Sequence, residues 1–445
     1  MTAPAVRSDE GNAMTARGHK RNHNMKSGGS FLIRTLLTTA AALCLRSGCG
    51  CILPVRADEP VHLPSSMVRT GSMPLSYADQ FSVDYYDGGC ALIKIHSEYE
   101  YLLVEEDAEI PDGLPEEITV LKKPLEHIYA ASSSCPDFFR ELGGMDKVTM
   151  TSTKAEDWTI PVIRDAVSRE DMIYVGKYSA PDYEYICDEG CDLAIENTMI
   201  YHAPEVSEML ERLEIPVMTE YSSYEEEPLG RLEWIRLYGV LTGREKEADT
   251  FFEEQVSGLK DVLPQSRDDG ESRPDEETGQ TEGSGQISGR VQTGDTSGTD
   301  VVFFYIGTNG TVNVRRENDY VTRMIEMAGG RYMLHDLVSS LPSSESGSGS
   351  VNLQMESFYA AAKDADVLIY NGTLGESLGC LEDLLAKNPL LADFKAVKDG
   401  RVYCSRDSLF QEVTGTCRMV MDLNRVICMG DGEDDEELTY IQKLR

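Results

Sequence analysis

Short apolar runs alternate with amphipathic segments over much of the chain, and this alternation constrains the fold more than any other feature. The apolar runs are typical of buried strands, and the amphipathic segments are typical of the helices that cover such strands. An alternation of this kind builds a parallel sheet from βαβ units. It predicts an α/β lobe over residues 127–228, which we call lobe 1. The expected strands are 127–131, 147–150, 172–175, 193–196 and 216–219, and the expected helices are 137–142, 160–167, 182–188 and 204–213.

The same alternation returns after residue 300 and predicts a second lobe over residues 301–430, which we call lobe 2. Between the lobes, residues 229–263 carry apolar side chains at helical spacing, with an interruption near Thr242 and Gly243. The sequence therefore predicts an α/β fold of two doubly wound lobes joined by a long backbone helix. In lobe 2 the expected strands are 301–306, 367–370 and 401–403, and the expected helix is 320–328.

Three further segments differ in composition from the lobes. Residues 58–126 contain Asp87-Gly88-Gly89 between two apolar runs, which predicts a linker and a small antiparallel β-hairpin element. Residues 264–300 consist almost wholly of Gly, Ser, Thr, Gln and charged residues, so we expect a disordered acidic insert. The end of the chain, residues 431–445, is expected to be an acidic tail.

Residues 1–57 have the parts of an export signal. Basic residues precede an apolar stretch over 36–45, which is too short to span a membrane and ends at Ser47-Gly48-Cys49. This ending is similar to the signal of a bacterial lipoprotein, in which Cys49 would be lipidated and anchor the protein to the outer face of the cell membrane. The alternative is ordinary cleavage after Ala57, which would give a periplasmic or secreted protein.

The chain is strongly acidic, with 77 acidic and 41 basic residues and a formal charge of −36. Such a charge repels a phosphate backbone, so we expect no nucleic-acid partner. The cysteines form no CxxC pair, and even the close pair Cys187 and Cys191 is interpreted as free thiols rather than as a disulfide or zinc site.

One motif favours an enzyme, and its surroundings argue against that reading. Residues 375–379 fit the GxSxG pattern of α/β hydrolases, with Ser377 as the nucleophile. In that fold the catalytic histidine follows the serine, whereas the last histidine here is His335. We therefore expect no enzyme, no catalytic residue and no cofactor of the protein's own. A metal site built from distant residues remains an alternative, because such a site needs no local motif.

Polar and aromatic side chains follow the expected strands of both lobes. Open α/β sheets bind ligands at the carboxyl ends of their strands, so these residues are candidates for ligand contacts. The alternative is that they are ordinary polar loop residues. The candidates are Ser133, Lys177, Tyr178, Glu196, Asn197, Tyr221, Asn309, Arg315, Tyr370 and Asn371.

Several segments together resemble one known family. Glu184-Tyr185-Ile186 followed by residues 191–195 is similar to the ExI...PDLVI segment of class III periplasmic binding proteins, with Cys191 in place of the proline. Glu356 and the residues that precede 365–369 resemble its counterpart in the second lobe, and residues 228–239 resemble the start of the family's backbone helix. The family serves ABC importers of iron-siderophores, haem and cobalamin.

The resemblance implies a two-lobed monomeric receptor that captures a metal chelate and delivers it to a membrane permease. It also implies that Glu184 and Glu356 dock onto arginines of the permease, a contact that suits carboxylates exposed at helix starts. The alternative is that both glutamates only complement the dipoles of their helices. Iron chelate, haem and cobalamin all remain open as cargo, as does a bare metal ion.

Overall fold

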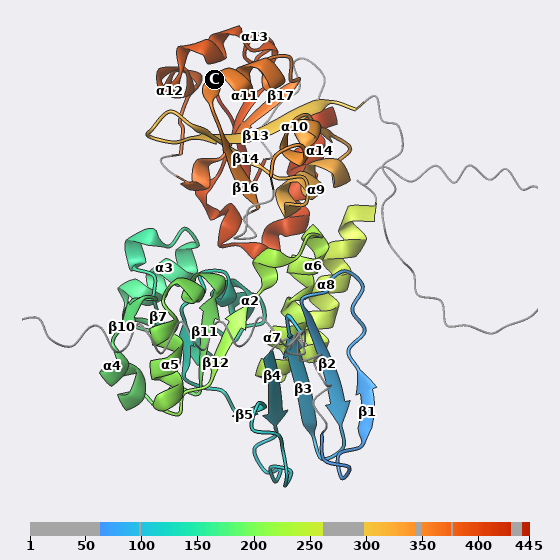
Figure 1. The fold of residues 1–445 in the computed structure, drawn as a ribbon, viewed down its shortest axis with the longest axis vertical. Helices are drawn as coiled ribbons and strands as arrows, with labels where there is room; N and C mark the ends of the chain where they lie inside the picture. Colours follow the sequence, from blue (N-terminus) through green and yellow to red (C-terminus); the bar gives the residue numbers. More distant parts are fainter. Residues whose placement is uncertain (1–62, 98, 261–297, 343–348, 375–376, 429–437) are drawn as a thin grey trace, which may run out of the picture. The chain divides into compact units, whose positions relative to one another are not determined.

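The computed structural model describes residues 63–97, 99–260, 298–342, 349–374, 377–428 and 438–445 (Figure 1). The expected export segment with Cys49, and residues 264–297 of the expected insert, lie outside the described residues. Residues 62–445 form one compact unit. Within it, the described residues build two α/β lobes, a group of helices and an additional N-terminal sheet.

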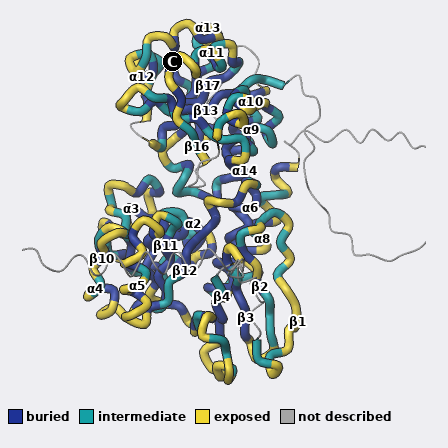
Figure 2. Tube along the Cα trace, in the orientation of Figure 1, coloured by how far each residue is buried: buried dark blue, intermediate teal, exposed yellow. Residues whose placement is uncertain are grey.

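Lobe 1 is a parallel five-stranded sheet with helices on both faces. The strands are buried along most of their length, because helices α2 and α3 cover one face and α4 and α5 cover the other (Figure 2). In sheet order the strands are β12 (Val217–Glu220), β11 (Leu193–Asn197), β6 (Ile128–Ala130), β7 (Val148–Thr151) and β8 (Ile173–Tyr174), and the helices are α2 (Cys135–Glu141), α3 (Pro161–Ser168), α4 (Tyr183–Asp188) and α5 (Pro204–Arg212).

Lobe 2 is built around a mixed sheet. Its centre, β13 (Asp300–Ile306), β17 (Val367–Tyr370) and β18 (Val402–Ser405), is parallel. The antiparallel strands β14 (Val312–Arg315), β16 (Ser350–Leu353) and β19 (Ile441–Lys443) extend it, and β15 (Arg331–Tyr332) pairs with β13. The helices are α9 (Tyr320–Met327), α10 (His335–Ser339), α11 (Met355–Ala362), α12 (Leu381–Lys387), α13 (Lys395–Lys398) and α14 (Thr416–Cys428).

The expectation of an acidic tail over 431–445 is wrong for residues 438–445. Strand β19 pairs with β18, and Ile441 is fully buried in the core. The acidic residues that suggested a tail precede this strand in the sequence, whereas Leu438, Tyr440, Ile441 and Leu444 supply the apolar surface that holds it.

The backbone helix consists of three consecutive helices, α6 (Pro228–Glu233), α7 (Ile235–Thr242) and α8 (Glu245–Lys260). Every residue of α6 is buried, and α7 is buried from Ile235 to Leu241. Helix α7 ends at Gly243, whose backbone is left-handed with a φ of 69°, a conformation that glycine adopts without a steric penalty.

The N-terminal element is larger than the expected hairpin. It is a five-stranded sheet in the order β1 (Arg69–Ser72), β2 (Phe81–Tyr86), β3 (Cys90–Ile95), β4 (Tyr99–Val104) and β5 (Thr119–Lys122). The hairpin prediction missed the two edge strands, because β1 is exposed throughout and β5 has only four residues. We call β1–β5 the N-terminal sheet.

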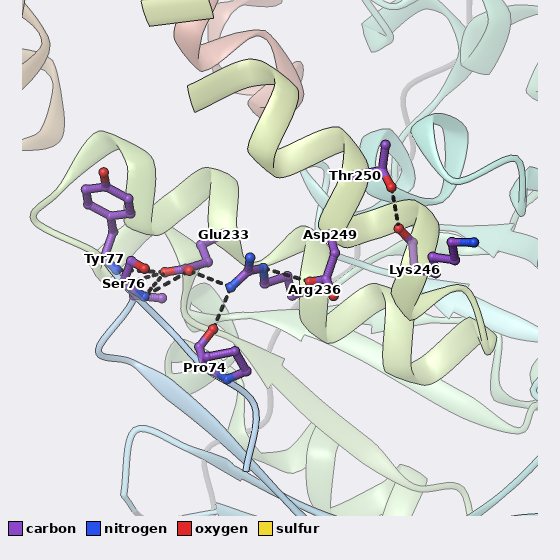
Figure 3. A network of polar contacts seen from close by, with 9 residues as sticks. Pro74, Ser76, Tyr77, Glu233, Arg236, Lys246, Asp249 and Thr250 are labelled. Atoms are coloured by element: carbon purple, nitrogen blue, oxygen red, sulfur yellow. Dashed lines mark hydrogen bonds and ion pairs between the residues drawn. The ribbon is translucent and has the colours of Figure 1, made fainter. Parts of the chain in front are cut away.

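A buried carboxylate attaches the N-terminal sheet to the helices. Glu233 of α6 accepts hydrogen bonds from the backbone N–H groups of residues 76–78 at 2.8–3.1 Å. Arg236 donates to Glu233 and to the carbonyl of Pro74 and forms an ion pair with Asp249 of α8 (Figure 3). Converging N–H donors stabilise an anion away from water, so this network fixes the segment before β2 against the helices.

A second buried carboxylate continues this attachment. Glu225 accepts hydrogen bonds from the backbone N–H groups of Asp79 and Gln80 and from Nε1 of Trp234. Burial raises the pKa of Glu225 to about 7, and the three donors act in the opposite direction. The N-terminal sheet also contacts lobe 1 directly. The hydroxyl of Tyr101 in β4 donates to the carbonyl of Val217 at 3.0 Å, and Val217 belongs to β12, the edge strand of the lobe 1 sheet.

The described cysteines carry free thiols, and Cys187 and Cys191 are not bonded to each other. None of the described helices combines the length and the hydropathy that a membrane crossing needs.

Candidate ligand-binding cleft

A cavity of about 1040 Å³ lies between residues of lobe 1, lobe 2 and helix α6. Lobe 1 contributes the chain that follows β6, β11 and β12, so the carboxyl ends of three parallel strands meet here, as the sheet geometry predicts. Lobe 2 contributes the end of β14 and the start of α9, and α6 contributes Arg231. The volume is at the upper end of the range of small-molecule sites in proteins.

Glu220 is a buried carboxylate of lobe 1 that lines the cavity, and serine hydroxyls of the protein bind it. Glu220 accepts hydrogen bonds from the hydroxyls of Ser132, Ser134 and Ser222. Glu220 and Ser132 are buried, and Glu220 is the last residue of β12. This arrangement satisfies the oxygens of the carboxylate within lobe 1, so Glu220 shapes the wall of the cavity.

Three arginines form the basic part of the lining: Arg231, Arg315 and Arg316. The guanidinium of Arg231 lies 3.9 Å from the ring centroid of Tyr320, a cation–π contact. Within the described residues, the Nε atoms of Arg231 and Arg316 are buried and have no hydrogen-bond partner.

Arg315 is held in place by its neighbours in lobe 2. It forms an ion pair with Asp319 at 3.5 Å, and its guanidinium lies 5.1 Å from the ring centroid of Phe410. Burial raises the pKa of Asp319, while Arg315 lowers it. Nη2 of Arg316 donates to the carbonyl of Pro342 at 3.0 Å. The arginines are therefore preorganised, with planar donors that suit carboxylate and other paired oxygen acceptors.

The structure places Ser133, Asn197 and Arg315, of the candidates expected from the sequence, in the cavity lining. The other candidates do not line this cavity. Lys177 is exposed in β9 (Gly176–Lys177), which pairs only with β10 (Ala180–Pro181) among the described strands, and Tyr178 packs against the apolar cluster of α4 and α5. Asn309 is exposed and binds Thr311 within its own turn.

The remaining four candidates are buried away from the cavity lining. Tyr370 lies in the core of lobe 2, and Asn371 accepts hydrogen bonds from Thr373. Tyr221 follows β12 but is covered by other aromatic rings. Glu196 is fully buried within lobe 1, and burial raises its pKa to about 8. For Glu196, which lies within β11, the cause is that side chains alternate between the two faces of a strand and that its neighbour Asn197 takes the face that ends at the cavity.

The sequence reasoning missed Arg231 and Arg316. Arg231 stands within the apolar segment Pro228-Leu229-Gly230-Arg231-Leu232, where a basic residue is an exception that could have been noticed. Arg316 follows Arg315 directly, so the pair of adjacent arginines at the end of an expected sheet segment was the available signal.

The two glutamates expected to contact a permease are both exposed. Glu184 is in the first turn of α4, and Glu356 is in the first turn of α11. Such positions leave each carboxylate open to a partner, and the docking role itself stays a prediction.

The sequence left two alternatives open, a hydrolase with Ser377 as its nucleophile and a receptor for a bare metal ion. Ser377 of the GxSxG segment has its hydroxyl 3.9 Å from the thiol of Cys404, while residues 375 and 376 lie outside the described part. Within the described residues, no group of three or more His, Cys, Asp or Glu side chains is placed to hold a metal ion.

Comparison with known proteins supports the fold. No family model matches the chain. An uncharacterized lipoprotein of Methanocaldococcus jannaschii is 22% identical over 417 residues, covering 85% of this chain and 88% of the relative. A second uncharacterized lipoprotein of that organism is 24% identical over 389 residues, with the same coverage of both chains.

A likeness in fold is found with a solved structure. A periplasmic binding protein from Veillonella parvula superposes with a TM-score of 0.50 at 17% identity, covering 72% of this chain and 96% of that one. A periplasmic haem-binding protein of Vibrio cholerae gives a TM-score of 0.48 at 16% identity, covering 67% and 99%. The resemblance expected from the sequence is confirmed at the level of the fold: the described chain has the two-lobed α/β fold of a periplasmic binding protein.

Proposed function

We propose that this protein is an extracytoplasmic binding lipoprotein of an ABC importer, which captures an anionic metal chelate between its lobes. The observation that carries the proposal is the cavity of about 1040 Å³ lined by three arginines. The names of the two relatives support a lipoprotein, and Cys49 is the residue we propose to be lipidated.

The case for an anionic ligand rests on the planar donors of the three arginines, because the carboxylates that line the cavity outnumber them. Glu220 and Glu225 are bound by donors of the protein itself, and Asp319 is paired with Arg315. Glu226 and Glu317 also line the cavity. Arg231 and Arg316 nevertheless line the cavity in a chain whose formal charge is −36. A planar guanidinium binds paired oxygen acceptors such as a carboxylate through two parallel hydrogen bonds.

This preference divides the possible cargoes. An iron chelate with carboxylate or catecholate groups, and haem with its two propionates, both present paired anionic oxygens. A cobalamin is rimmed mainly by neutral amides, so it makes less use of the arginines. We therefore favour an iron–siderophore or haem as the cargo.

Delivery requires contact with a permease, and we propose Glu184 and Glu356 as the contact residues on lobe 1 and lobe 2. Both carboxylates are exposed in first helical turns. A double variant, Glu184→Ala with Glu356→Ala, should bind the chelate as the wild type does but lose delivery through the permease. Unchanged delivery would contradict the docking role.

The binding proposal is tested by thermal denaturation of the full-length chain with ferric tricatecholate, ferric citrate, haem, cobalamin and ferric ions alone. A ligand that binds only the folded state raises the free energy of unfolding by about 2.7 kcal/mol at a hundredfold excess over Kd, and the midpoint temperature rises with it. We expect a shift with at least one anionic chelate.

The arginines give this test its control. Arg316→Gln should weaken chelate binding by about tenfold or more, since a charge-assisted hydrogen bond contributes about 1.5–3 kcal/mol. Arg164→Gln, at an exposed position of α3, should leave binding unchanged. No shift with any chelate would contradict the proposal, and a shift with ferric ions alone would favour a bare-metal receptor.

A further inference from the structure

A cluster of aromatic side chains lies where the N-terminal sheet meets lobe 1. Its centre is Tyr221, which is buried directly after β12. The ring of His96 stacks on Tyr221 with a centroid distance of 4.4 Å and an interplanar angle of 7°. Tyr224 meets Tyr221 edge to face at 5.5 Å. These geometries are the favourable ones for aromatic pairs, so the rings fix one another.

Hydroxyl groups connect the same cluster. The Tyr99 hydroxyl lies 3.0 Å from the Tyr201 hydroxyl, which in turn contacts the hydroxyl of Tyr221. Nδ1 of His96 lies 2.8 Å from Oε1 of Gln80. Tyr99 belongs to β4 and His96 to the turn after β3, so the N-terminal sheet contacts both Tyr221 and Tyr201.

The cluster continues into the cavity between the lobes. Tyr224 and Met199 line the cavity, and Met199 stands two residues before Tyr201. Their side chains remain open to solvent, at 41% for Tyr224, 48% for Met199 and 46% for Tyr201. On the lobe 2 side, Leu374 also lines the cavity and is 46% exposed.

Exposed apolar side chains gathered at the edge of a cavity are typical of a ligand-binding surface. Tyrosine faces and a methionine thioether favour aromatic rings, through stacking and sulfur–aromatic contacts. Two of the cavity's arginines already contact aromatic rings of the protein, Arg231 on Tyr320 and Arg315 on Phe410, whereas Tyr224 and Met199 are open to solvent. The cavity therefore presents two chemistries, a basic part built by Arg231, Arg315 and Arg316 and an apolar part built by Tyr224 and Met199. Tyr201 is exposed next to this apolar part and is connected to Tyr224 through the ring of Tyr221.

We propose that Tyr224, Tyr201 and Met199 form a subsite for a flat conjugated ring of the bound chelate. The N-terminal sheet positions this subsite through His96 and Tyr99. The inference rests on the proposed function, and it adds that the sheet outside the two lobes takes part in ligand selection. A preorganised aromatic surface raises affinity because the rings lose little freedom on binding.

The experiment compares two anionic ferric chelates on the full-length chain, ferric tricatecholate, which carries aromatic rings, and ferric citrate, which carries none. Equilibrium dialysis gives Kd for each, and the ratio of the two Kd values measures ring recognition. Tyr224→Ala should weaken ferric tricatecholate binding by about tenfold and change ferric citrate binding by less than about twofold. Tyr224→Phe should restore the wild-type ratio, because it keeps the ring.

The positioning role has its own variants. His96→Ala should change the ratio in the same direction as Tyr224→Ala but by a smaller factor, and His96→Phe should restore it by keeping a stacked ring. A purely structural role of His96 would lower the unfolding midpoint and leave the ratio unchanged. Met209→Ala, at an exposed position of α5 outside the cavity lining, is the matched control for Met199→Ala.

The outcomes separate the inference from the proposed function. If the wild type binds neither of these chelates and does not bind haem, the proposed function fails and the subsite falls with it. If both chelates bind and Tyr224→Ala weakens both equally or neither, the subsite is wrong and the proposed function stands. A wild type that binds only ferric tricatecholate supports the subsite, provided that Tyr224→Ala loses that binding.

Discussion

Glu196 and Asn197 are neighbours on β11, yet their side chains face opposite sides of the lobe 1 sheet. Asn197 reaches the cavity between the lobes. Glu196 enters the apolar cluster that Tyr129 and Ala194 share with α4 and α5. Within the described residues, neither oxygen of Glu196 has a hydrogen-bond partner, which explains why burial alone raises its pKa to about 8.

This burial predicts how stability depends on pH. The folded chain holds the proton of Glu196 up to about pH 8, whereas the unfolded chain releases it near the ordinary value of 4.5. The free energy of unfolding therefore falls as pH rises through this window and levels off above it. Glu196→Gln removes the titration. We expect the variant to match the wild type at pH 5 and to be more stable by on the order of 3 kcal/mol at pH 9.

Urea unfolding at pH 5, 7 and 9 checks this prediction. Glu211→Gln, at an exposed position of α5, is the control that should follow the wild type throughout. An identical pH dependence in the wild type and in Glu196→Gln would show that the carboxyl group is solvated in solution.

The candidate site was only partly predictable from the sequence at this scale. Strand ends could be located, and this brought Ser133, Asn197 and Arg315 to the cavity lining. The face of the sheet to which each side chain points could not be predicted, because a strand that is buried on both faces shows no alternation of polar and apolar residues. Glu196 and Tyr370 were chosen for their polarity, although both face the interior.

At the scale of elements, the sequence predicted the strands and helices of lobe 1 and the parallel centre of lobe 2, and it missed the antiparallel strands β14, β16 and β19. The expected strand 367–370 has the bounds of β17, and the expected helix begins at residue 320, as α9 does. Both segments have strong apolar patterns in the sequence. The N-terminal sheet was underestimated, since β5 pairs in parallel with β4 across a long connection. Such non-local pairing leaves no turn signal in the sequence.

The contact between α7 and α8 depends on a glycine. A Cβ atom at Gly239 would lie 2.7 Å from Cβ of Ala248 and 3.1 Å from Cα of Glu245. The two helices therefore approach as closely as they do only because position 239 lacks a side chain. Gly239→Ala should lower the free energy of unfolding by about 2 kcal/mol, because overpacking outweighs the better helix propensity of alanine.

Gly258→Ala in α8 is the matched control, since a Cβ atom there would meet only the flexible end of Met421 at 3.4 Å. It should raise the free energy of unfolding by about 0.5 kcal/mol through helix propensity. Denaturant unfolding of both variants measures the two effects. A neutral or stabilising Gly239→Ala would mean that the helices separate at little cost.

At the scale of the whole unit, the two lobes are joined by buried polar contacts besides the helices. Asp137 of α2 in lobe 1 accepts hydrogen bonds from the backbone N–H and the hydroxyl of Thr414 in lobe 2, both at 2.8 Å. Arg140 donates to Asp137 and to the Thr414 hydroxyl. A second contact joins Gln411 of lobe 2 to the backbone and hydroxyl of Thr159. A movement of one lobe relative to the other must therefore either break these hydrogen bonds or move both partners together.

These contacts predict that the lobes unfold together. Thr414→Val removes the hydroxyl and leaves Asp137 and Arg140 with one bond fewer each, which should lower the free energy of unfolding by about 1–2 kcal/mol. Both tryptophans of the chain, Trp158 in lobe 1 and Trp234 between α6 and α7, lie outside lobe 2. Tryptophan fluorescence should nevertheless show the full shift and coincide with far-UV circular dichroism.

Thr250→Val, at an exposed position of α8, is the control and should change stability by less than about 0.5 kcal/mol. If Thr414→Val shifted the circular dichroism transition but left tryptophan fluorescence unchanged, the lobes would be independent folding units. The bonds of Asp137 would then hold two stable lobes at a set separation without coupling their stability. A ligand that reached both sides of the cavity would in that case have to supply the coupling itself, and its binding should merge the two transitions into one.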